Sequence, residues 1–142
     1  MSDSTNAVEE WASNFPKKAT PTYSQRHLFQ IKHCGNVEIR VRDGNEEIWA
    51  DGIDLKTGEL LEAKYIEKPN NSPYISGSTI PPFIRIKAVG DVENEFRRYA
   101  AVINDPNTPV IALRVIVNIK EAVPFFDGLL QQFNLPGRVV IQ

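Results

Sequence analysis

Residues 49–65 read WADGIDLKTGELLEAKY. The stretch predicts a β-hairpin, because residues 47–53 and 60–66 form strand-like arms on either side of a turn at residues 55–58. Glu62 and Lys64 are two apart on the second arm, so their side chains share one face of the sheet. Leu61 and Ala63 are expected to point the other way, into the core. A carboxylate and an ammonium on such an apolar strand are costly unless they have partners or a task.

The length of the hairpin loop decides which aspartate joins this pair. In a four-residue loop, Gly58 adopts the left-handed conformation, Asp54 caps the turn and Asp51 lies opposite Glu62. A two-residue turn at residues 57–58 also puts Asp51 on the Glu62 face, whereas a three-residue loop selects Asp54. We favour Asp51, because Asp54 already has a structural role as the capping residue.

Asp51, Glu62 and Lys64 together suggest phosphodiester chemistry. The two carboxylates can hold Mg²⁺ through oxygen ligands, with water in the other positions. Such a cation polarises a phosphodiester and lowers the pKa of a bound water. Lys64 can orient or deprotonate that water and offset charge at the phosphate. The alternative is a surface ion pair on an edge strand with no catalytic role.

Composition is that of an ordinary globular domain. The chain has 142 residues, of which 42% are hydrophobic and 24% charged. No apolar run reaches the roughly 18 residues that span a bilayer, and the first residues show no secretory signal. Because Cys34 is the single cysteine, an internal disulfide is excluded. Cys₄ and Cys₂His₂ zinc sites are also excluded, because the chain has one cysteine and two histidines, His27 and His33.

Charge is unevenly distributed along the chain. Residues 15–42 carry six Lys or Arg against one acid, and residues 43–67 carry eight acids against two lysines. A basic flank beside an acidic cluster suits a site that holds a cation and a polyanion together. The alternative is two solvated faces of opposite sign.

The order of elements predicts an α/β domain with a mixed sheet. Asp91 is expected to cap a helix, and residues 14–22 to form a linker. The long loop at 67–82 is expected to be irregular. The remaining predicted elements are helices at 5–13, 24–34, 91–104 and 120–134, and strands at 37–41, 83–87, 110–117 and 138–142.

The hairpin resembles the PD-(D/E)XK nucleases, whose motif is an Asp on one strand and E-x-K on the next. The closest similarity is to the restriction-endonuclease-fold toxin-2 domains of bacterial polymorphic toxins. It is carried by residues 49–74, 97–118 and 133–142, with FQIKHCG at 29–35 as the end of the first core helix. The resemblance implies a restriction-endonuclease-like core, a central mixed sheet flanked by helices in αβββαβ order plus a C-terminal helix and strand. The domain would span 23–142, after an extension or linker at 1–22.

The resemblance also implies a function. Such a domain is the C-terminal part of a larger secreted or contact-delivered toxin that acts in the cytoplasm of competitor bacteria, and a cognate immunity protein protects the producer. Asp51, Glu62 and Lys64 match the catalytic positions, with Asp51 and Glu62 as ligands of Mg²⁺, or of Mn²⁺ or Zn²⁺. DNA is the expected substrate and no membrane partner is expected. An RNase acting on tRNA, or an inactive module that binds nucleic acid or protein, is the alternative.

Three further residues are candidates for substrate binding. Gln30 matches a position where related nucleases often place a polar side chain near the metal. Arg97 and Arg98 could contact phosphates; a solvated helix face is the alternative. The sequence shows no aromatic stacking array and no helix-turn-helix, so no residue is assigned to base reading.

Overall fold

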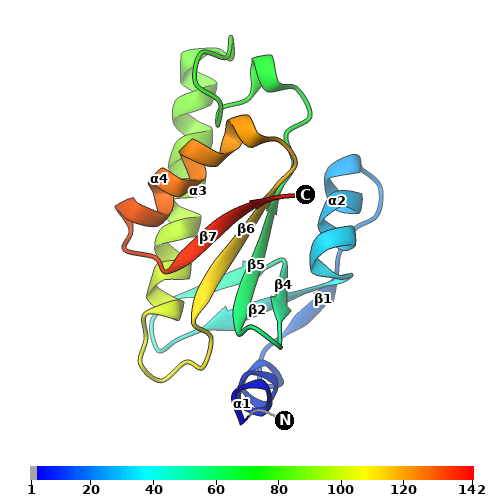
Figure 1. The fold of residues 1–142 in the computed structure, drawn as a ribbon, viewed down its shortest axis with the longest axis vertical. Helices are drawn as coiled ribbons and strands as arrows, with labels where there is room; N and C mark the ends of the chain where they lie inside the picture. The colour runs from blue at the N-terminus through cyan, green and yellow to red at the C-terminus, as the bar shows by residue number, and fades with distance from the viewer. Residues whose placement is uncertain (1–2) are drawn as a thin grey trace.

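The computed structural model describes residues 3–142. These residues form four α-helices, two short 3₁₀ helices and seven strands. Figure 1 shows their arrangement. The helices are α1 (Asp3–Ala12), α2 (Gln25–Cys34), η1 (Pro69–Asn71), α3 (Pro82–Ile103), η2 (Lys120–Ala122) and α4 (Val123–Gln132). The strands are β1 (Lys17–Ala19), β2 (Val37–Arg42), β3 (Glu47–Ala50), β4 (Gly52–Asp54), β5 (Glu59–Lys64), β6 (Ala112–Val117) and β7 (Gly137–Ile141).

The strands form two sheets that meet at Asp51. A three-stranded antiparallel sheet has the order β1-β2-β3, and a four-stranded mixed sheet has the order β4-β5-β6-β7. In the mixed sheet β4 is antiparallel to β5, while β5, β6 and β7 run parallel. The arm expected at residues 47–53 is therefore divided, because the chain bends at Asp51 as it passes from one sheet to the other. The α/β class with a mixed sheet is confirmed.

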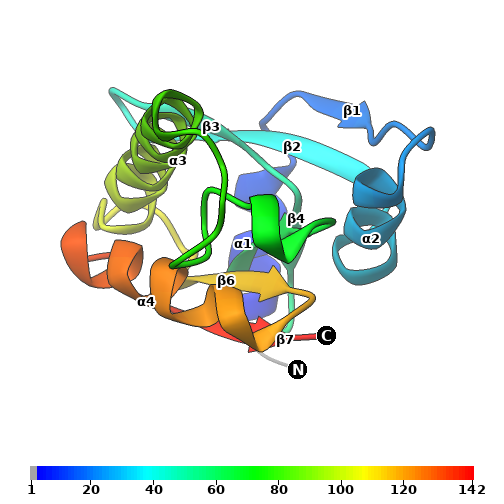
Figure 2. The same ribbon diagram turned by 90° about the horizontal axis from the view of Figure 1, so that it is seen from above.

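Helices cover the mixed sheet from two sides. Figure 1 and Figure 2 show α3 and α4 on one side of the molecule and α2 on the other. The core cluster joins Phe96 and Tyr99 of α3 and Phe126 of α4 to Leu60 of β5. None of the helices within residues 3–142 is long and apolar enough to cross a membrane.

Both faces of β5 are buried: Leu61 lies in the core as expected, but the main core cluster lies on the other face. Leu60 belongs to the core cluster, and by strand alternation Glu62 and Lys64 share its face. Leu61 is also buried, but its neighbour on β4 is Gly52, which packs against the end of α2. A Cβ atom at Gly52 would lie 2.3 Å from the Cys34 carbonyl oxygen, so only glycine allows this approach. The polar pair therefore points toward α3, and Leu61 toward α2.

The helix expected from Asp91 begins earlier, at Pro82. The alternation in residues 83–87 reads as a strand, but proline at the helix start is well tolerated and pre-sets the first turn. Arg85 then anchors this turn by donating to the Pro73 and Ser78 carbonyl oxygens at 3.0 and 3.3 Å. Asp91 is therefore not a cap; it lies mid-helix in an exposed ion pair.

The N-terminal segment packs against the domain. Val8 of α1 is only 1% exposed and belongs to the core cluster. Residues expected to form a linker include β1, which pairs with β2 at the edge of the three-stranded sheet. The domain boundary at residues 22–23 stays a prediction.

Candidate active site

The β4–β5 hairpin has the four-residue loop expected from the sequence. Asp54 pairs with Glu59, and its Oδ1 accepts hydrogen bonds from the amides of Lys56 and Thr57 at 3.0 and 3.3 Å. Gly58 adopts φ 75° and donates to the Asp54 carbonyl oxygen at 2.9 Å. Gly52 pairs with Leu61, where the β4–β5 pairing ends, so Asp51 lies just beyond the last pair of the hairpin.

Asp51 is tied to the strand that carries the E-x-K sequence. Its backbone amide donates to the Leu61 carbonyl oxygen at 3.0 Å. Its Oδ2 accepts a hydrogen bond from the Ala63 amide at 2.8 Å. These two contacts fix the main chain and the side chain of Asp51 against β5, close enough to Glu62 and Lys64 for their charges to act on one another.

Helix α3 holds the other two members of the set. Lys64 Nζ lies 3.0 Å from Glu62 Oε2 and 2.7 Å from Glu95 Oε1. The Tyr99 hydroxyl donates to Glu62 Oε1. Glu95 and Tyr99 are four residues apart, so they project from one face of the helix. Each therefore contacts one member of the Glu62–Lys64 pair.

Burial and repulsion disfavour the charged forms of both carboxylates. Burial, with smaller contributions from Glu38 and Glu95, raises the pKa of Asp51 to about 7 despite the Ala63 hydrogen bond and the charge of Lys64. Burial also raises the pKa of Glu62 well above its usual range, and the Asp51 charge adds to this. Two acids that repel each other in a buried place are suited to a cation between them.

The surroundings of Lys64 favour its charged form. Burial alone would lower its pKa, but the carboxylates of Glu62 and Glu95 outweigh burial and raise the pKa of the ammonium above its ordinary value. Lys64 is therefore positively charged at neutral pH. A permanently charged ammonium suits hydrogen bonding and charge compensation better than proton abstraction.

The donor set fits a divalent cation only in part. Asp51 and Glu62 supply hard oxygen ligands of the kind that Mg²⁺ prefers. Among residues 3–142, however, no three His, Cys, Asp or Glu side chains converge as a ready metal site. Mg²⁺ usually keeps several waters and takes one or two protein carboxylates, so two are compatible with it. Glu62 would have to exchange its contact with Lys64 for the cation.

Gln30 is connected to Asp51 through the carboxylate of Glu38. Its Nε2 donates to Glu38 Oε2 at 2.6 Å, and Gln30 is 7% exposed. Glu38 is one of the charges that raise the pKa of Asp51. The structure therefore connects Gln30 to Asp51 by way of Glu38, and its role in substrate binding stays a prediction.

Arg97 and Arg98 are engaged elsewhere. Arg97 forms an ion pair with Glu46 at 2.7 Å, and Arg98 donates to the Glu47 carbonyl oxygen at 3.0 Å. Both contacts tie α3 to the turn before β3. The structure does not bring either side chain to Lys64, and phosphate binding by them stays a prediction.

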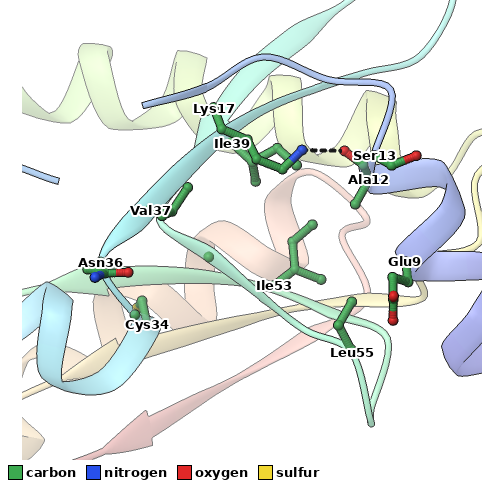
Figure 3. A pocket seen from close by; sticks show the side chains of 12 residues that line it. Glu9, Ala12, Ser13, Lys17, Cys34, Asn36, Val37, Ile39, Ile53 and Leu55 are labelled. Atoms are coloured by element: carbon green, nitrogen blue, oxygen red, sulfur yellow. Dashed lines mark hydrogen bonds between the residues drawn. The ribbon is translucent and has the colours of Figure 1, made fainter. Parts of the chain in front are cut away.

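A pocket of about 390 Å³ lies between α1, the end of α2 and the β4–β5 hairpin (Figure 3). Its lining is mostly apolar, and Lys17 turns its Nζ to the Ala12 carbonyl oxygen at 3.0 Å. The described residues that line it include Gly52 and Ile53, and Asp51 is not among them. This pocket is therefore separate from the carboxylate pair.

Sequence reasoning missed two contacts of the site. Tyr99 is fully buried, yet its hydroxyl reaches Glu62. A buried tyrosine needs a partner for its hydroxyl, which was the available signal. Glu95 is 31 residues from Lys64, and no local pattern connects them.

Comparison with known families agrees with this geometry. A search of curated proteins found no match. The sequence matches the family described as restriction endonuclease fold toxin 2 over residues 25–136, which is well over half of the chain. The matched range begins at α2 and contains Asp51, Glu62, Lys64 and their partners on α3. The chain therefore belongs to the restriction endonuclease fold toxin 2 family.

Proposed function

We propose that this chain is a metal-dependent endonuclease toxin that hydrolyses phosphodiester bonds of DNA. Membership of a restriction-endonuclease-fold toxin family supports a nuclease toxin. The observation that carries the proposal is the hydrogen bond from the Ala63 amide to Asp51 Oδ2 at 2.8 Å, which holds Asp51 against the strand that carries Glu62 and Lys64, with the Lys64 ammonium 3.0 Å from Glu62.

In this proposal Asp51 and Glu62 are the protein ligands of a divalent cation, Mg²⁺ in the first instance. When bound, the cation supplies Lewis-acid polarisation of the phosphodiester and a water of lowered pKa. Asp51 stays oriented by the Ala63 amide, and Glu62 by the Tyr99 hydroxyl. These contacts hold the two carboxylates in place before substrate arrives, which is what a preorganised site requires.

Lys64 acts in this proposal as a charged donor beside the phosphate. Its raised pKa keeps the ammonium protonated. If Glu62 turns to the cation, Glu95 at 2.7 Å remains as the carboxylate partner of Lys64. Lys64 then orients the attacking water and offsets negative charge at the phosphate.

The family assignment supports a setting for this activity. The domain would be delivered to competitor cells by secretion or contact, as part of a larger toxin. It would act on nucleic acid in the target cytoplasm, while a cognate immunity protein protects the producing cell.

Cleavage assays test the proposal directly. The purified chain is incubated with plasmid DNA and with total tRNA, in Mg²⁺ and in EDTA, beside Asp51→Ala and Lys64→Ala. Lys56→Ala, an exposed lysine at the tip of the same hairpin, is the matched control. We expect Mg²⁺-dependent cutting of plasmid that both site variants lose and the control keeps. Cutting of tRNA but not of plasmid would show that the substrate is RNA rather than DNA. No cutting of either polymer with any divalent cation would contradict the nuclease and favour a module that only binds.

Expression in bacteria tests the toxin role. Wild type is expected to arrest growth of a host that lacks the immunity protein, whereas Lys64→Ala is expected to be tolerated. Protein levels of the two are compared by immunoblot. Equal growth at equal protein level would contradict the toxin role.

A further inference from the structure

A second pocket, of about 480 Å³, lies where β5 ends and α2 begins. It is built from two segments far apart in sequence, and the Tyr65 hydroxyl joins them by donating to Gln25 Oε1 at 3.0 Å. Its lining is aromatic and polar rather than aliphatic. The residues that line it include Tyr23, Gln25, Arg26, His27, Tyr65 and Glu67.

Three aromatic rings contribute to this pocket. Tyr23 is 84% exposed, and its ring meets His27 edge-on with centroids 4.8 Å apart. Tyr65 is supported from behind by Phe29, with centroids 5.4 Å apart. His27 is fixed by Ser24, whose hydroxyl lies 2.6 Å from its Nδ1. Two rings are thus held in place, while the Tyr23 ring is open to solvent and free to stack on a planar ligand.

The polar groups of the pocket suit the edge of a nucleobase. Arg26 and Gln25 are exposed and supply donors, and the amide of Gln25 also supplies an acceptor. Glu67 is exposed and can accept from an exocyclic amino group. The Glu67 carboxylate would repel a phosphate, so the lining favours a base over the sugar-phosphate chain.

The pocket and the proposed catalytic set meet at the end of β5 on opposite sides of the strand, because Lys64 points toward Glu95 of α3 and Tyr65 toward Phe29 of α2. Tyr65 directly follows Lys64 at the end of β5, and strand alternation places it on the side of α2. Helix α2 begins with Gln25 at the pocket and also carries Gln30, whose side chain contacts Glu38, one of the charges that act on Asp51. The end of β5 and helix α2 therefore connect the pocket to the carboxylates of Asp51 and Glu62.

We propose that this pocket binds an unpaired nucleobase of the substrate strand, next to the phosphodiester held at the Asp51–Lys64 set. This inference rests on the proposed function and adds a base-binding subsite to it. Bases of single strands commonly stack on aromatic side chains while their edges form hydrogen bonds. The sequence alone shows no stacking array, because Tyr23 and Tyr65 line the same pocket only in the folded chain.

Fluorescence of 2-aminopurine tests the subsite. Single-stranded DNA and RNA oligonucleotides that carry the probe at successive positions are titrated with protein in Ca²⁺, an oxygen-binding cation that can occupy the carboxylates. We expect quenching at one position. Tyr23→Ala is expected to abolish the quench and weaken binding by roughly 5- to 150-fold, the value of one stacked base.

Phe83→Ala is the matched control, because Phe83 is also an exposed aromatic, at 74%. Neither side chain belongs to the core, so both variants are expected to keep the wild-type Tm. Equal binding and quenching by Tyr23→Ala and wild type, or no quench at any probe position, would overturn the subsite. Cleavage in Mg²⁺ is followed in parallel: cutting without a Tyr23 effect refutes the subsite alone, and probe binding without cutting refutes the nuclease alone.

Discussion

Replacing Asp51 with asparagine should stabilise the metal-free protein at neutral and alkaline pH. Burial raises the pKa of Asp51 from its ordinary 3.8 to about 7 in the folded chain. Between about pH 4 and pH 7 the folded state therefore holds a proton that the unfolded state has released. The free energy of unfolding falls as pH rises through this window. Asparagine removes the ionisation and can still accept the hydrogen bond from the Ala63 amide.

The size of the effect follows from the pKa. A rise from 3.8 to about 7 corresponds to ~4 kcal/mol, because each pKa unit is worth about 1.4 kcal/mol. Glu62 repels Asp51 and shares its burial, so part of the cost remains in the variant. We therefore expect Asp51→Asn to raise the free energy of unfolding by about 2 kcal/mol at alkaline pH, and by much less at acidic pH.

Urea denaturation in EDTA, at about pH 5 and about pH 8, measures this difference. Asp54→Asn is the matched control from the same hairpin. A hydrogen bond from Arg114 lowers the pKa of Asp54 below its ordinary 3.8, so its ionised form stabilises the fold at both pH values, and the control should lose a similar amount of stability at each. A wild type equally stable at both pH values, or an Asp51→Asn variant no more stable than wild type at the higher pH, would refute the reasoning.

Three further outcomes are expected. Tyr99→Phe keeps the buried ring but removes the donor to Glu62, and should cost about 1.5–3 kcal/mol in urea denaturation; unchanged stability would contradict this. Burial raises the pKa of Glu59, but hydrogen bonds from two arginines outweigh it and lower the pKa to about 2. Its stabilisation, ~3 kcal/mol above about pH 4.5, is lost as pH falls toward 2, and Glu59→Gln should flatten this acid limb. Mg²⁺ at about 100 times its Kd should stabilise wild type by about 2.7 kcal/mol in thermal unfolding, with little effect on Asp51→Asn.

Local chemistry explains why the hairpin could be predicted. Asp54 caps the turn through contacts two and three residues away, and Gly58 takes the positive φ that the loop requires. These short-range interactions set the register, which ends with Gly52 opposite Leu61 and leaves Asp51 next to β5. Helix α2 was predictable for a similar reason, since Ser24 caps its start and Gly35 its end.

Local patterns misled where packing decides the structure. Residues 83–87 alternate like a strand, yet they open α3 because Arg85 binds the carbonyls of the preceding loop. Residues 17–19 lie between prolines, yet they pair with β2 at a sheet edge. Leu61 is buried in the core as expected, but the main core cluster lies on the Leu60 face of β5. Alternation tells which side chains share a face, but not which face the helices cover.

The sequence by itself predicted the fold class from the order of its elements, and the proximity of Asp51, Glu62 and Lys64 from a turn of a few residues. Only the tertiary structure decided what surrounds them. Tyr99 reaches Glu62 across 37 positions and Glu95 reaches Lys64 across 31. Tyr65 meets Gln25 across 40 positions, on the opposite side of the sheet. Such contacts depend on how helices pack on a sheet, which no short-range pattern of residues records.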